Sequence, residues 1–205
     1  MRSRSVRLLR AVLLLLTTLL LASGPEWKTV RAADGLTVEW RAVKDSAFEE
    51  VKVSTLSARP LGALCEAVWG KDAKVEGDFK KRVIIRESDS ERWTYEQIRV
   101  PLVTDRDCVM HAQLIAPAQS GRCEVTFESG SDPAYPKAKG HVRVGAVRGR
   151  WTLEPADDGK VAITYVVYSE PGGAIPAFLA RGGQRDAAVA FLKTILARAE
   201  QGKGP

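Results

Sequence analysis

The chain of 205 residues has a formal net charge of +6, and its pI of about 9.3 would by itself point to a nucleic-acid partner. Residues 1–32 hold six basic residues against the single acidic Glu26, so the rest of the chain is close to +1. That balance argues against nucleic-acid binding, and the length fits one domain that buries a core or encloses a cavity.

The N-terminus has the order of a secretory signal peptide. Four arginines between Arg2 and Arg10 precede an apolar run from Ala11 to Ala22. This run is shorter than the roughly 20 residues that cross a bilayer. Small residues around Ala32 suit cleavage, so we expect a signal peptide over residues 1–32 and an exported domain over residues 33–205, either periplasmic or secreted. The alternative is an uncleaved N-terminal membrane anchor.

The expected domain opens with extended chain and one helix. Leu36–Trp40 suits a strand or a helix start, and alternation predicts extended chain over Ala47–Ser57. Apolar residues at helical spacing predict a helix over Leu61–Val68, which Pro60 opens and Gly70 ends.

Strands dominate the middle of the chain. The polar segment Lys71–Lys81 is expected to be a loop, and turn-rich segments separate the strands that follow it. Asp157-Asp158-Gly159 predicts a hairpin turn. The expected strands are Arg82–Glu87, Arg92–Val100, Cys108–Ile115, Cys123–Glu128, His141–Arg148, Trp151–Glu154 and Val161–Tyr168.

An amphipathic helix ends the chain. Its apolar stripe consists of Val189, Leu192, Ile195, Leu196 and Ala199. A meander of antiparallel strands followed by such a helix predicts an α+β fold in which a curved sheet holds the helix across its concave face.

Glycines punctuate the approach to this helix. Gly172, Gly173 and Pro176 lie between the last strand and the helix, and they suit the hinge of a lid over a cavity mouth. A second pair, Gly182 and Gly183, is expected to interrupt the helix. An ordinary strand-to-helix turn is the alternative.

Alternation along two strands predicts one apolar inner face. Cys108, Met110, Ala112 and Leu114 share it on one strand, and Cys123, Val125 and Phe127 share it on the next. Such faces either pack solidly on the last helix or leave a wholly apolar pocket. The expected cavity residues are Met110, Ala112, Leu114, Val125, Phe127, Phe178, Leu192 and Ile195.

Cysteines and histidines give no metal or cofactor site. Cys65, Cys108 and Cys123 could form one disulfide and leave one free thiol. Cys108 and Cys123 are expected on adjacent strands but several residues out of register, too far apart for easy disulfide geometry. We expect all three to be small apolar packing residues. Neither His111 nor His141 has a partner at metal-ligand spacing, and no catalytic motif occurs. We therefore expect no enzyme.

Three segments carry a resemblance to a known family. WTYEQIRVPLVTDRD (Trp93 to Asp107), GRWTLEP (Gly149 to Pro155) and SEPGGAIPAFL (Ser169 to Leu179) occur in an order and at a spacing that resemble the START (StAR-related lipid-transfer) domain family. The resemblance covers roughly Leu36 to Glu200. It implies the helix-grip fold and a cavity for a lipid or other hydrophobic small molecule, with lipid transport and transient membrane contact.

The resemblance also bears on single residues. Arg106 and Asp107 match a charged turn of the family, and we expect them to hold backbone groups. The family's cavity arginine, six residues after Arg106, is replaced by Ala112, which puts sterol binding in doubt. Two alternatives remain: an aromatase/cyclase-like enzyme on the same fold, and a packed envelope interaction domain without a ligand.

Overall fold

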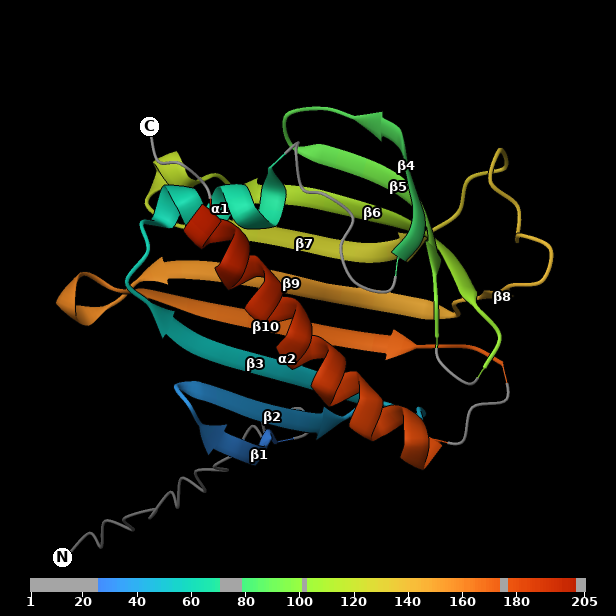
Figure 1. The fold of residues 1–205 in the computed structure, drawn as a ribbon, viewed down its shortest axis with the longest axis horizontal. Coiled ribbons are helices and arrows are strands. Elements are labelled where there is room, and N and C mark those ends of the chain that lie inside the picture. Colours follow the sequence, from blue (N-terminus) through green and yellow to red (C-terminus); the bar gives the residue numbers. More distant parts are fainter. Residues whose placement is uncertain (1–25, 71–78, 101–102, 174–176, 202–205) are drawn as a thin grey trace, which may run out of the picture.

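One open antiparallel sheet forms the frame of the protein (Figure 1). The computed structural model describes residues 26–70, 79–100, 103–173 and 177–201. The strand order is β1-β2-β3-β10-β9-β7-β6-β5-β4, and the short β8 pairs in parallel with β6. The strands are β1 Lys28–Ala33, β2 Leu36–Ala42, β3 Glu49–Ser57, β4 Phe79–Glu87, β5 Glu91–Ile98, β6 Arg106–Ala116, β7 Cys123–Gly130, β8 Val142–Arg143, β9 Ala146–Pro155 and β10 Val161–Glu170.

Two helices cover the concave side of this sheet. Figure 1 shows the long helix α2 (Ala177–Gln201) running obliquely across the strands, with α1 (Leu61–Trp69) beside its C-terminal end. The buried side of α2 is its apolar stripe, where Ala188, Leu192, Ile195 and Ala199 are at most 4% exposed. The helix-grip expectation is confirmed.

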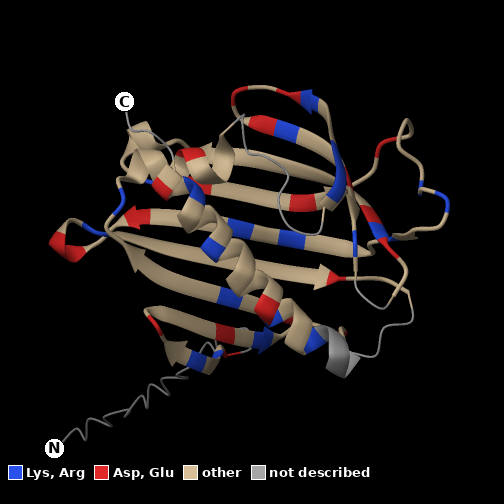
Figure 2. Cartoon of the chain, viewed as in Figure 1, with Lys and Arg blue, Asp and Glu red and all other residues tan. Residues whose placement is uncertain are grey.

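Alternation explains why the strands bury one face. On β3, Val51 and Val53 are fully buried, and on β10 Ile163 and Tyr165 face the same interior. One-residue alternation sends the intervening side chains to the convex face, where water solvates them. Figure 2 shows positions of Lys and Arg interspersed with positions of Asp and Glu along the sheet and α2.

Three expected boundaries were wrong. The two strands expected between His141 and Glu154 are instead the two-residue β8 and the ten-residue β9. Gly149 lies inside β9. A Cβ at this position would lie 2.3 Å from the Phe127 ring and from the Val166 carbonyl, so only glycine allows these groups to come so close. Strand β4 begins at Phe79, inside the expected loop. The charged pair Arg106 and Asp107 begins strand β6 and forms no turn.

The N-terminal part of α2 also differs from expectation, because the helix runs through Gly182 and Gly183 without a break. Glycine costs roughly 1 kcal/mol relative to alanine inside a helix. Polar contacts hold this turn in place: Arg181 donates to the Ala47 carbonyl at 2.9 and 3.0 Å, and Arg185 pairs with Glu49.

The expectation for the cysteines was wrong for two of the three. Cys65 on α1 and Cys123 on β7 form a disulfide, with 5.8 Å between their Cα atoms. Cys108 is the free and buried cysteine, as a packing residue should be. The disulfide fastens α1 to the sheet.

None of the helices in the described part of the chain is both long enough and apolar enough to cross a membrane.

Candidate functional site

A cavity of about 510 Å³ lies between the concave face of the sheet and α2. Small side chains contribute to its lining from both sides: Ala112 on β6, and Ala187, Ala188 and Ala190 on α2. The solidly packed alternative expected from the sequence is therefore wrong. The volume falls within the 300–1,000 Å³ typical of small-molecule sites.

Most of the expected cavity residues lie in this wall. Met110, Ala112, Val125, Phe127 and Ile195 line the cavity. Leu114 and Leu192 pack into the core cluster instead, although their strand and helix each contribute other residues to the wall. The side chain of Phe178, like Pro176, lies outside the described residues.

One region of the wall is aromatic. Trp151 on β9 stacks on Tyr165 on β10 with 4.1 Å between ring centroids, and Phe191 of α2 meets both rings edge-on. Burial raises the pKa of Tyr165, so its phenol stays neutral. These rings form an apolar surface suited to an acyl chain or a ring system.

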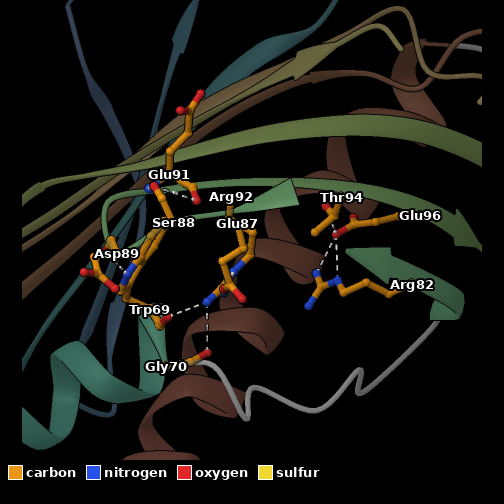
Figure 3. Close-up of polar contacts among 10 residues, drawn as sticks. All are labelled: Trp69, Gly70, Arg82, Glu87, Ser88, Asp89, Glu91, Arg92, Thr94 and Glu96. Carbon is orange, nitrogen blue, oxygen red and sulfur yellow. Dashed lines mark hydrogen bonds and ion pairs between the residues drawn. The ribbon is translucent and has the colours of Figure 1, made fainter. Parts of the chain in front are cut away.

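The other region of the wall is polar, and the sequence did not reveal it (Figure 3). Arg82 on β4 and Glu96 on β5 line the cavity, and the Arg82 Nε and Nη2 atoms both lie 2.7 Å from Glu96 Oε1. Thr94 Oγ1 donates to the same oxygen at 3.1 Å. The expectation of a wholly apolar pocket was wrong, because it considered only β6 and β7.

A second arginine joins the wall to α1. Arg92 donates to the Trp69 carbonyl at 2.9 Å and to Glu87 at 2.6 Å, and its guanidinium lies 4.8 Å from the centre of the Trp69 ring (Figure 3). The C-terminal carbonyls of a helix lack partners within the helix, so this contact satisfies the end of α1. Arg92 thus fixes the part of α1 that closes one end of the cavity.

The pair Arg106 and Asp107 holds backbone groups, as expected. Arg106 donates to the carbonyls of Pro171 and Gly172 at 3.2 Å. Gly172 and Gly173 both have positive φ, and a Cβ on Gly172 would lie 2.8 Å from the Arg143 carbonyl, so the loop needs glycine there. Arg106 and the two glycines fix this loop at the end of β10; their expected role as a hinge stays a prediction.

Asp107 is the centre of a buried network. It accepts from Arg143 at 3.0 Å through both carboxylate oxygens, from the Ala138 N–H at 2.7 Å and from Tyr95 at 3.2 Å. Burial alone raises the pKa of Asp107, but the hydrogen bonds and the charge of Arg143 outweigh it and hold the pKa below its ordinary value. The carboxylate is therefore charged and fully occupied by structural partners.

Other candidate groups make no metal centre within the described ranges, which contain no cluster of three or more His, Cys, Asp or Glu suited to a metal. His111 stacks on Trp93 and lies 2.8 Å from Glu91. Cys108 lines the cavity, and burial raises the pKa of its thiol, which keeps it protonated.

Known proteins show the same architecture, although no family model matches the chain. An uncharacterized protein of Pseudomonas aeruginosa is 31% identical over 88% of this chain and 90% of its own length. The phosphatidylcholine transfer protein of Mus musculus is 25% identical over 85% and 84%.

A solved structure extends the likeness to three dimensions. The STAR-related lipid transfer protein of Xanthomonas axonopodis is 26% identical, covers 85% of this chain and 98% of its own, and superposes with a TM-score of 0.73. The curved antiparallel sheet with the long C-terminal helix across it agrees with this structural match. The chain belongs to the START (StAR-related lipid-transfer) domain family.

Proposed function

We propose that this protein is an exported carrier that binds a lipid or other hydrophobic small molecule non-covalently in the cavity between the sheet and α2. The observation that carries the proposal is the cavity of about 510 Å³, walled by apolar side chains over most of its surface. Burial of apolar ligand surface supplies the affinity, at about 25 cal/mol per Å² before the costs of association.

The polar region favours an amphiphile over a pure hydrocarbon. A hydrocarbon would cover Arg82 and Glu96 without offering any hydrogen bond, and buried charged groups without full solvation are costly. An amphiphile brings its own polar group to this place. The sequence placed sterol binding in doubt because Ala112 replaces the cavity arginine of the family. Arg82 on β4 and Glu96 on β5 weaken that objection, because they offer a sterol hydroxyl group a polar partner from other strands.

Export and transport are the finer parts of the proposal. A disulfide forms in oxidising compartments, and the Cys65–Cys123 bond supports the export that the N-terminal arginines and apolar run predict. The similarity to a phosphatidylcholine transfer protein supports lipid transport. Transient membrane contact during loading is part of the same proposal.

A binding role is favoured over catalysis. Glu96 is a carboxylate in the cavity wall, which the sequence did not predict, but its Oε1 accepts hydrogen bonds from Arg82 and Thr94. A general base needs a lone pair directed at the substrate and a pKa suited to the reaction. An ion-paired carboxylate is better suited to binding a polar group.

Native mass spectrometry of the protein purified from the periplasm of a bacterial host tests the proposal. We expect a lipid-sized mass that leaves the protein on unfolding, and saturable displacement of a fluorescent fatty acid by that lipid. An unliganded mass together with no uptake of the fluorescent probe would refute the carrier function. Recovery of the protein only from the cytoplasm would refute export alone.

A further inference from the structure

Gln184 on α2 presents a buried acceptor that has no donor. Its Nε2 donates to the Ser169 carbonyl, whereas its Oε1 is buried and makes no hydrogen bond with the described residues. The assignment of the two amide atoms follows from the partner, because a carbonyl can only accept. Gln184 also lines the cavity. A buried acceptor without a partner is destabilising, and a donor from a ligand removes that cost.

The strand register places Gln184 and Thr94 at the same level along the strands, on opposite sides of the cavity. Ser169 on β10, the partner of Gln184, pairs with Val147 on β9, and the Val147 N–H donates to the Ser129 hydroxyl on β7. Ser129 in turn pairs with Met110 on β6, which pairs with Thr94 on β5. One transverse row therefore joins Gln184 on one side of the cavity to Thr94 on the other, with Glu96 two residues beyond. The aromatic residues Trp151 and Tyr165 lie further along their strands, towards α1.

Gln184 Oε1 is the acceptor of this row that lacks a donor. It has no partner among the described residues, whereas Glu96 Oε2 lies 4.0 Å from the Cys108 thiol. The Arg82 guanidinium is paired with Glu96, since its Nε and Nη2 both lie 2.7 Å from Glu96 Oε1. A ligand head group that only accepts, such as an ester, leaves the buried acceptor unsatisfied.

We propose that Gln184 is a specificity-determining residue that selects amphiphiles carrying a hydroxyl or N–H donor. This inference rests on the proposed carrier function and deepens it. The donor of the head group meets Gln184 Oε1 in the transverse row. The apolar tail extends towards Trp151, Tyr165 and Phe191.

Two probes with one acyl chain test this selection. 1-Oleoylglycerol carries two free hydroxyl groups and methyl oleate carries none. We measure the displacement of a fluorescent fatty acid from wild-type protein, Gln184→Leu and Gln184→Met. Thr194→Val is the matched control, because Thr194 lines the same cavity on α2 and its hydroxyl is already bonded to the Ala190 carbonyl at 3.1 Å.

We expect wild type and Thr194→Val to prefer 1-oleoylglycerol about tenfold, and both Gln184 variants to lose most of that preference. Equal affinity of wild type for the two probes, or a preference that survives both Gln184 variants, overturns the role of Gln184 and leaves the carrier function intact. Failure of wild type to take up any probe overturns the carrier function itself. Circular dichroism checks that each variant is folded. If only one of the two Gln184 variants folds, that variant alone is enough for the test.

Discussion

At the scale of single residues, Asp107 is the side chain on which the structure depends most. It is completely buried and receives hydrogen bonds from β5, the loop before β8, and Arg143. We expect Asp107→Ala to lower the free energy of unfolding by about 2–4 kcal/mol, since it leaves several buried donors unpaired. Urea denaturation measures this, and uptake of a fluorescent fatty acid by the folded fraction should stay near normal.

Asp105→Ala is the control for that change. Asp105 pairs with Lys80 near the surface, and such pairs contribute about 0–1 kcal/mol. Normal stability of Asp107→Ala with abolished uptake would assign Asp107 to the ligand site instead.

The charge of Asp107 also predicts a pH dependence. Because its folded pKa lies below the ordinary value, the carboxylate stabilises the fold fully above that value and loses its contribution as the pH falls through the lower, folded pKa. The difference in urea midpoint between wild type and Asp107→Asn should therefore be constant near neutral pH and shrink below about pH 4. A difference that stays constant down to pH 2 would contradict this.

At the scale of elements, the disulfide holds α1 against β7. By loop-closure entropy, a crosslink across 58 residues stabilises the fold by about 4 kcal/mol. We expect Cys65→Ser/Cys123→Ser, and wild type under dithiothreitol, to melt roughly 10 °C lower. Cys108→Ala, which removes the unbonded thiol, is the control: dithiothreitol should lower its melting temperature as much as that of wild type. Identical melting of oxidised and reduced wild type would refute the disulfide's role.

Strand β1 bears on the cleavage site that the proposed export requires. A cut at Ala33 removes all of β1 except its last residue, although β1 pairs with β2 along its length. The Trp27 ring lies 4.5 Å from the Arg41 guanidinium and 4.6 Å from the Lys52 ammonium, and such contacts contribute about 0.5–1 kcal/mol each. We therefore expect the mature protein that the proposed export would produce to begin before Trp27. N-terminal sequencing decides between that start and Ala33.

At the scale of the whole molecule, the cavity is the property that separates a carrier from a packed domain. Ala112→Trp places a large ring in the space beside Met110 and Phe127. We expect it to abolish uptake of a fluorescent fatty acid while the urea midpoint stays near wild type, because the ring fills existing space. In a close-packed interior the same change would cost about 1–3 kcal/mol or more.

Ala162→Trp is the matched control, because Ala162 lies on β10 between the buried Val161 and Ile163 and points to the other face. It should leave uptake unchanged. An unfolded Ala112→Trp protein, with no binding of any apolar probe by wild type, would rule out the carrier.

The sequence by itself determined the elements and their faces. Alternation and helical spacing are local properties, so the buried faces of β6 and β7 and the stripe on α2 were predictable, as was the hairpin turn at Asp157. The family resemblance then selected the helix-grip arrangement among the folds that these elements allow. Predicted strand boundaries were wrong where a contact distant in sequence overrode local preference. At Gly149, for example, the close Phe127 ring requires a glycine within β9.

Only the tertiary structure decided the chemistry of the site. The Cys65–Cys123 bond joins residues 58 positions apart, and no spacing rule predicts which of three cysteines will meet. Arg82, Glu96 and Gln184 come from β4, β5 and α2, and each looks like an ordinary surface residue in the sequence. They face one cavity because cross-strand register and the placement of α2 bring them together, and both depend on the packing of the entire chain.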